Sequence, residues 1–216
     1  MDIQSIKKEI IQIARRLYKK NCLVGADGNI SYRLSNNQIL ITSSGKPKAF
    51  LSEHDFSIIT LDNKIIEGTP SSERLMHLTI YRHCPEAVCV VHAHPPTAIA
   101  WSIAFPEDKE LPSSCLSEVI LAMGNVPIIA YARPGTQEMG SYLIPYLPDN
   151  RAFILARHGA LTWGESLNEA SHGMERLEHT VGILKSAIEL QKLTYLPDDE
   201  VIYLKQCKKQ LGPKLL

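Results

Sequence analysis

The chain has 216 residues, of which 23 are basic and 23 acidic, so it carries no formal net charge at neutral pH. This length suits one α/β domain with a substantial core, and because no linker divides the sequence we expect a single domain over residues 1–216. The balanced charge argues against nucleic acid or an anionic membrane as a partner, and the lack of a signal peptide or a bilayer-spanning apolar run predicts a cytoplasmic protein.

The first twenty residues are predicted to form an amphipathic helix, because isoleucine and leucine recur there at intervals of three and four residues. Two strands should follow, over 25–34 and 38–45, each next to a glycine turn. The segment 56–68 reads as a hairpin, since Asp62 and Asn63 separate two β-branched runs.

A helix is expected after Gly68, with Ser71 or Ser72 as its N-cap and Glu73 in its first turn, where a carboxylate suits the helix dipole. It should end before Cys84-Pro85. Beyond it, the sequence predicts a strand over 87–94 and a short helix over 97–104.

The last third should contain a strand over 125–132, another apolar strand over 151–164 that is broken at His158-Gly159, and a long helix from Ser166. Ser166 and Glu169 have the spacing of a capping box. Strands and helices therefore alternate irregularly, which predicts an α/β fold whose mixed or largely antiparallel sheet is covered by helices.

Two kinds of site find no support. Neither G-x-G-x-x-G nor G-x-x-x-x-G-K-[ST] occurs, so nothing indicates a nucleotide cofactor. The five cysteines are scattered and contain no C-x-x-C pair, so we expect reduced, mostly buried thiols in place of disulfides or a zinc ribbon.

The segment VVHAHPP, residues 90–96, contains the first candidate metal ligands. Side chains alternate across a strand, so His92 and His94 project from one face and are close enough to chelate one ion. The alternative is that they are simply polar residues at the end of a strand.

His158 adds a third histidine, which also terminates an apolar strand, and the glycine after it permits close approach of another backbone or of a ligand. Three histidines leave a fourth coordination position open, as in catalytic zinc sites. Alternatively, His158 is a hydrogen-bonded core histidine.

Glu73 and the serines before it form a candidate anion site, because free N–H groups at a helix N-terminus favour anions. The Gly28-Asn29 and Ser44-Gly45 turns have the same potential as donor-rich loops, although they can equally be plain turns. His77 and the trio His172, Glu175 and His179 have spacings that permit metal binding, but such spacings are more typical of solvated or interface faces of helices.

Five motifs occur in order: GNISYR (28–33), ITSSG (41–45), PSSE (70–73), HAH (92–94) and RHG (157–159). Together they span nearly the whole chain and resemble the class II aldolase/adducin family, in particular its L-fuculose 1-phosphate aldolases and related sugar-phosphate aldolases. The resemblance implies a three-layer α/β/α fold around a mostly antiparallel sheet, and a homotetramer with active sites at subunit interfaces.

The same resemblance implies one Zn²⁺ per subunit, held by His92, His94 and His158, with Mn²⁺ or Co²⁺ as alternatives, and Glu73 as acid/base and at times a further ligand. The phosphate of a sugar phosphate would be bound by Gly28, Asn29, Ser44, Gly45, Ser71 and Ser72. The expected reaction is cleavage of a phosphorylated ketose to dihydroxyacetone phosphate and an aldehyde through a metal-stabilised enediolate. We further expect partial burial to raise the pKa of Glu73 while the metal opposes the rise.

Other positions keep related activities open. Tyr131 matches an interfacial tyrosine of the aldolases, whereas Leu116 and Leu211 stand where the aldolases have two others. Glu118 lies close to the acid/base glutamate of methylthioribulose 1-phosphate dehydratases of the family, or is a surface carboxylate. Family decarboxylases of phosphorylated keto acids share Glu73 and an Arg-Pro-Gly turn, which here is residues 133–135. The adducin branch is a non-enzymatic interaction module. It has lost the histidines that would bind the metal, whereas this sequence has all three.

Overall fold

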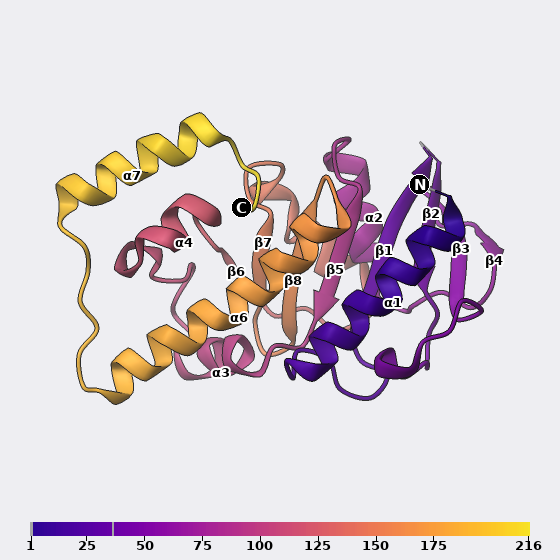
Figure 1. Cartoon of the computed structure of the whole chain (residues 1–216), viewed down its shortest axis with the longest axis horizontal. Coiled ribbons are helices and arrows are strands. Elements are labelled where there is room, and N and C mark those ends of the chain that lie inside the picture. Colours follow the sequence, from indigo (N-terminus) through magenta and orange to yellow (C-terminus); the bar gives the residue numbers. More distant parts are fainter. Residues whose placement is uncertain (1, 36) are drawn as a thin grey trace.

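The structure, a computed structural model, describes residues 2–35 and 37–216. In these ranges the strands join into one eight-stranded sheet with the order β4-β3-β2-β1-β5-β8-β7-β6 (Figure 1). The strands are β1 (Asn29–Ser35), β2 (Gln38–Thr42), β3 (Phe56–Thr60), β4 (Ile65–Glu67), β5 (Cys89–Ala93), β6 (Ile128–Ile129), β7 (Ala152–Leu155) and β8 (Gly159–Gly164).

The helices of the described residues are α1 (Ile3–Lys19), α2 (Arg74–His83), α3 (Pro96–Ala104), α4 (Ser117–Ala122), α5 (Gln137–Ser141), α6 (Leu167–Glu189) and α7 (Asp198–Leu211). Three 3-10 turns accompany them: η1 (Lys48–Phe50), η2 (Ser113–Cys115) and η3 (Ile144–Tyr146). The predicted first helix, the hairpin β3–β4 and the long helix α6 are all present. No helix in this part of the chain combines the length and apolar character that crossing a bilayer requires.

The sheet is mixed, which corrects the expectation of a mostly antiparallel one. β6 pairs in parallel with β7, while the other neighbouring strands run antiparallel. A parallel neighbour requires a crossover connection, and the chain between β6 and β7 contains α5 and η3. The sequence pattern over 125–132 predicts a strand but cannot tell which neighbour it joins.

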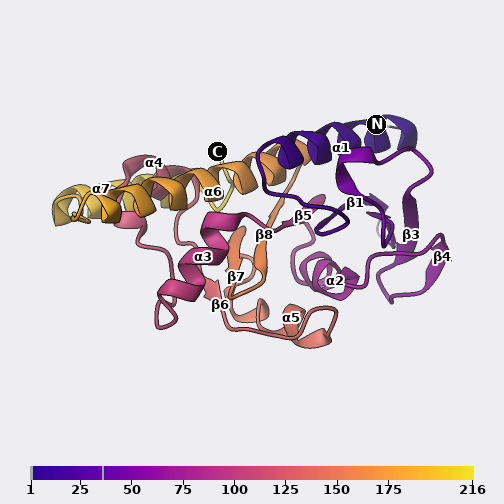
Figure 2. The ribbon, with the colours of Figure 1, turned by 90° about the horizontal axis from the view of Figure 1, so that it is seen from below.

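Helices lie on both faces of the sheet. α1 and α6 cover one face, and α2 and α5 lie on the other (Figure 2). Each face has its own apolar core, because successive strand residues point in opposite directions: Ile30 and Leu40 contribute to the core under α1, whereas Ile39 and Ile41 contribute to the core on the α2 side. The site described below lies at the end of β5, between these layers.

The start of α2 differs from the prediction. The helix begins at Arg74, so Glu73 is its capping residue and not part of the first turn. The Ser71 hydroxyl accepts a hydrogen bond from the Glu73 backbone N–H at 3.3 Å. This leaves the Glu73 side chain free to point toward the sheet. The helix ends at His83, as predicted.

The segment over 151–164 is two strands and not one interrupted strand. β7 and β8 pair antiparallel with Leu155 opposite Gly159, and the turn between them contains Arg157 at φ +60° and then His158. At the start of α6, Ser166 accepts from the Glu169 N–H at 3.1 Å, but the Glu169 carboxylate bonds to Arg151 and to the Glu165 N–H, so only half of the predicted capping box forms.

The C-terminal segment, which the sequence did not place, forms α7 and then returns to the body of the molecule. α7 packs against α4, and Leu215 is buried beside Gly173 of α6. The five cysteines are free thiols; Cys22, Cys84 and Cys89 are buried, while the other two are half-buried.

Candidate metal centre and active site

The three candidate histidines meet at one point on the sheet. His92 lies near the end of β5 and His94 follows it, so both project from the same face. β8 is the neighbour of β5, with Ala93 opposite Ala160, and this pairing places the β7–β8 turn and its His158 beside the end of β5. The sheet register therefore brings together residues that are 66 positions apart.

The ring nitrogens face one another at distances suited to a metal ion. His92 Nε2 lies 3.1 Å from His94 Nε2 and 3.2 Å from His158 Nε2. A tetrahedral Zn²⁺ with bonds of about 2.0–2.1 Å separates neighbouring nitrogen ligands by about 3.3 Å. His92 Nδ1 donates to the Ala160 carbonyl at 2.9 Å, so Nε2 presents its lone pair to the centre. The donor set fits a divalent cation.

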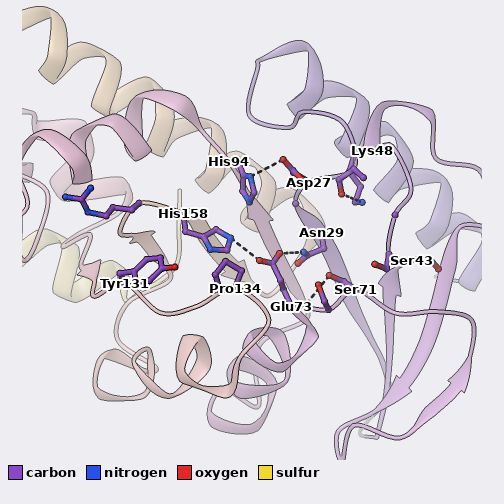
Figure 3. Close-up of a pocket in the computed structure, with 16 residues that line it drawn as sticks. Asp27, Asn29, Ser43, Lys48, Ser71, Glu73, His94, Tyr131, Pro134 and His158 are labelled. Atoms are coloured by element: carbon purple, nitrogen blue, oxygen red, sulfur yellow. Dashed lines mark hydrogen bonds and ion pairs between the residues drawn. The ribbon is translucent and has the colours of Figure 1, made fainter.

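Glu73 completes the cluster. Its Oε1 lies 2.9 Å from His158 Nε2 (Figure 3). Its Oε2 lies 3.3 Å from His92 Nε2. Within the described residues, Glu73 and the three histidines form the group whose ligand atoms all lie within 4.8 Å of one another. The arrangement offers three imidazole nitrogens and one carboxylate, with Glu73 either as a fourth ligand or as a base beside the ion.

The pKa of Glu73 is lowered in this arrangement, which corrects the expectation of a raised value. Burial alone would raise it, but the hydrogen bonds and positive charge of His158 and His92 outweigh burial and hold the pKa well below the ordinary range. His94 shifts in the direction that suits a ligand: burial and the neighbouring His92 and His158 lower its pKa to about 4, so it is neutral at pH 7.

A cavity of about 530 Å³ opens on this cluster. The cavity is lined by Glu73, His94 and His158. It is also lined by all six residues that the resemblance predicts to bind phosphate: Gly28, Asn29, Ser44, Gly45, Ser71 and Ser72. Gly28 has φ +74°, and a Cβ there would approach the His92 carbonyl oxygen to 2.8 Å, so only glycine lets this loop lie against the end of β5. The volume is that of a small-molecule site.

Lys48 lines the same cavity and was missed by the sequence analysis. Its side chain is buried, and Nζ donates to the carbonyls of Ala26 and Lys46 at 2.8 Å each. Lys48 thereby ties together the two glycine loops of the cavity. Among the described ion pairs none involves Lys48, and burial lowers the pKa of this amine. The sequence signal that could have found Lys48 is its place just after the Ser44-Gly45 turn.

The other two candidate residues lie in different places. Tyr131 lines the cavity and is 57% exposed. Glu118 is exposed on α4, hydrogen-bonded to the Ser117 hydroxyl, and is not among the described residues that line the cavity. The structure thus joins Tyr131 to the histidine cluster within one chain but does not join Glu118 to it.

Gly159→Ala should disturb the metal centre directly. A Cβ at this position would lie 2.5 Å from the Ala93 carbonyl oxygen and 2.9 Å from ring atoms of both His92 and His94. We expect a loss of about 1–3 kcal/mol of unfolding free energy and weaker zinc binding, measured by urea denaturation and zinc titration. Gly182→Ala, in open space on α6, is the control and should leave both quantities unchanged or slightly improved. Unaltered zinc affinity in Gly159→Ala would contradict the packing described here.

The metal-free protein should lose stability between pH 6.5 and pH 4. Burial lowers the pKa of His77 to about 3 and contributes most to lowering that of His94 to about 4, so below pH 6.5 the unfolded chain binds more protons than the folded one. The unfolding free energy therefore falls as pH falls, with a slope approaching about 3 kcal/mol per pH unit for two histidines. Urea denaturation from pH 7.5 to pH 4.5 measures it. A constant free energy over this range would refute the prediction, and His77→Gln should reduce the slope.

Comparisons with known proteins identify relatives of this chain. The sequence model for the class II aldolase and adducin N-terminal domain matches residues 8–184. The 3-oxo-tetronate 4-phosphate decarboxylase of Escherichia coli K12 is 35% identical over 187 residues, covering 84% of this chain and 86% of that protein. The L-fuculose phosphate aldolase of Methanococcus vannielii is 35% identical over 171 residues, covering 79% of this chain and 91% of that protein.

The fold is likewise that of a solved relative. YgbL from Escherichia coli, whose structure is described as that of an aldolase, epimerase or decarboxylase, superimposes with a TM-score of 0.87 at 32% sequence identity, covering 94% of this chain and 99% of YgbL. The family model's match over residues 8–184 includes Glu73 and the three candidate histidines.

Proposed function

Because this chain belongs to the class II aldolase/adducin family, we propose that it is a metal-dependent lyase that decarboxylates a phosphorylated 3-oxo sugar acid. The observation that carries the proposal is the convergence of three imidazole nitrogens and Glu73 at the mouth of a cavity lined by candidate anion-binding loops. The two curated relatives described above are lyases, one named as a decarboxylase and the other as an aldolase of a phosphorylated compound.

His92, His94 and His158 would hold the metal, which we propose to be Zn²⁺, with Mn²⁺ or Co²⁺ able to substitute. The ion supplies a Lewis acid that polarises the carbonyl oxygen of the substrate and accepts electron density when the adjacent carbon–carbon bond breaks. The remaining work falls to the protein. The loops with Gly28 and Gly45 and the serines before α2 would bind the phosphate, with Lys48 adding positive charge.

Glu73 would move the proton. When a 3-oxo acid loses CO₂, the electron pair of the breaking bond passes into the carbonyl and leaves an enediolate. Protonation of the carbon that carried the carboxylate then gives dihydroxyacetone phosphate if the substrate is a 3-oxo-tetronate 4-phosphate. Glu73 lies against the cluster and is well placed to deliver that proton and to recover it from water.

Leu116 is the residue that favours decarboxylation over aldol cleavage. Aldol cleavage requires a group that takes the proton from the hydroxyl of the departing aldehyde, and the resemblance assigns a tyrosine to this role at the position of Leu116. A carboxylate has no such proton to lose, so decarboxylation does not need that tyrosine. The second candidate function is zinc-dependent aldol cleavage of a phosphorylated ketose, which the 35% identity to an L-fuculose phosphate aldolase supports.

The remaining expectations stay proposals. We propose a homotetramer of single-domain subunits with Tyr131, an exposed residue, near an interface, which sedimentation analysis tests. The dehydratase alternative requires Glu118 to reach a reacting centre, and in this chain it lies on the surface. An adducin-like interaction module without a metal would bind no stoichiometric zinc. A cytoplasmic location also stays a prediction.

Hydrogen exchange and CO₂ release test the proposal together. Zinc-loaded protein in heavy water should exchange one proton of the hydroxymethyl group of dihydroxyacetone phosphate stereospecifically, because decarboxylation and aldol cleavage share this enediolate. It should also release CO₂ from a 3-oxo-tetronate 4-phosphate. Exchange without CO₂ release, and with aldehyde release from L-fuculose 1-phosphate, would select the aldolase. Neither exchange nor CO₂ release, despite one bound zinc per chain, would reject both.

A further inference from the structure

A chain of buried hydrogen bonds leads from Glu73 into the core. Asn29 Nδ2 donates to Glu73 Oε2 at 2.8 Å (Figure 3), and Asn29 Oδ1 lies 2.5 Å from His77 Nε2. His77 Nδ1 lies 2.7 Å from the Ser31 hydroxyl, which lies 2.8 Å from the Tyr81 hydroxyl. We call these five residues the buried ladder. Neither the metal ligands nor the cavity account for His77, Ser31 and Tyr81.

The ladder follows from the spacing of a helix beside a strand. Glu73, His77 and Tyr81 recur every fourth residue at the start of and along α2, so they lie on one face at a rise of about 6 Å per step. Asn29 and Ser31 are alternate residues of β1, on the face that α2 covers, at about 6.6 Å per step. The near-equal rises let strand and helix side chains interleave over the whole length.

The donors and acceptors fit in only one direction. A carboxylate accepts hydrogen bonds, so Asn29 must turn its NH₂ group to Glu73 and its oxygen to His77. His77 must then carry its proton on Nε2 and accept from Ser31 at Nδ1, while Ser31 accepts from the Tyr81 O–H. His77 is fully buried, and burial lowers its pKa to about 3, so it is a neutral imidazole with one donor and one acceptor nitrogen.

We propose that His77 is a positioning residue for Glu73, acting through the Asn29 amide, in the reaction proposed above on which this inference rests. By donating to Asn29 Oδ1, His77 prevents the amide from flipping. A flipped amide would set its oxygen against the Glu73 carboxylate and release Oε2. With the amide held, Oε2 keeps its hydrogen bond to Asn29, and the carboxylate is fixed with Oε1 2.9 Å from His158 Nε2.

The ring tautomer of His77 tests the direction of the ladder without reference to activity. In the ¹⁵N-labelled, zinc-loaded protein, long-range ¹H–¹⁵N spectra should show that His77 carries its proton on Nε2 and that its Nδ1 is unprotonated. The His77 signals are assigned by their loss in the His77→Gln variant. Asn29→Ala should shift the Nε2 proton resonance. A proton on Nδ1 would reverse the ladder and overturn the proposal.

Kinetics of three variants test the consequence. His77→Leu should slow hydrogen exchange into dihydroxyacetone phosphate about 10- to 100-fold in kcat, with KM and zinc content unchanged, whereas His77→Gln, which keeps an N–H near Nε2, should recover most of the rate. Leu78→Ala is the matched control: the residue is equally buried on the same helix but lies outside the ladder, so it should lower stability and leave kcat of the folded protein unchanged.

A double-mutant cycle with Asn29→Ala decides the route. If His77 acts through Asn29, adding His77→Leu to Asn29→Ala should cost less than about twofold further in kcat. Additive losses, or a His77→Gln variant as slow as His77→Leu, would overturn the proposal. Absence of exchange in the wild-type protein would contradict the proposed function instead, and the tautomer measurement would then decide the ladder by itself.

Discussion

Glu73→Gln should lower the rate of hydrogen exchange into dihydroxyacetone phosphate by a factor of about 10²–10⁴, because the amide can neither take a proton from carbon nor return it. The side chain keeps its size and lies against the same neighbours, so zinc binding should weaken only slightly. The measurement is loss of the hydroxymethyl proton signal by NMR in heavy water, with metal content determined on the same sample.

The control for this substitution is Glu67→Gln, on the exposed edge strand β4, which should exchange at the wild-type rate. Full exchange activity of zinc-loaded Glu73→Gln would remove Glu73 from the proton transfer. Glu118→Gln, measured in parallel, tests the dehydratase alternative. Only a dehydratase that uses Glu118 as its acid/base should lose turnover in this variant, in which Glu73 is intact.

His94→Ala should lose the metal and with it the catalytic activity. Removing one of three imidazole ligands should weaken zinc binding at least about a hundredfold, since even changes in the groups that orient a ligand cost 10- to 100-fold. Because the His94 side chain is 22% exposed, at the edge of the cavity, the metal-free protein should fold with nearly wild-type stability. Zinc competition with a chromogenic chelator gives the affinity, and urea denaturation gives the stability.

The matched control is His54→Ala, an exposed histidine outside the cluster, which should bind zinc as the wild type does. If His94→Ala bound zinc with unchanged affinity, the three-histidine site would be wrong. If it lost zinc but kept exchange activity, the enediolate chemistry would not need the metal.

Decarboxylation and aldol cleavage differ at this site only in the group that leaves. Both would produce the same enediolate beside the same carboxylate, and the relatives with those names are equally similar to this chain in identity. The specificity must then come from residues around the leaving group, where the resemblance puts Leu116 at the position of a proton-accepting tyrosine. Leu116 is half-buried next to α4, so the region to examine is the η2–α4 segment.

The sequence alone determined the local elements and the candidate ligands. The apolar period of α1 and α6, the Ser166 cap and the turn at Asp62-Asn63 are written in short stretches of chain, where side-chain spacing fixes helix or strand without distant contacts. The H-x-H pair is equally local, because alternation along a strand places both rings on one face. The five short motifs then carried the family resemblance, and with it the third ligand.

Only the tertiary structure decided how these pieces meet. Glu73 became a capping residue pointing at the histidines. The pKa that burial was expected to raise is lowered, because His92 on β5 and His158 in the β7–β8 turn approach the carboxylate. Lys48 acquired a role by bridging two loops. His77 has a spacing typical of solvated or interface helix faces and is instead fully buried against β1. These features depend on sheet register and helix placement, which are set by packing between residues about 20 to 85 positions apart, and no local pattern encodes that packing.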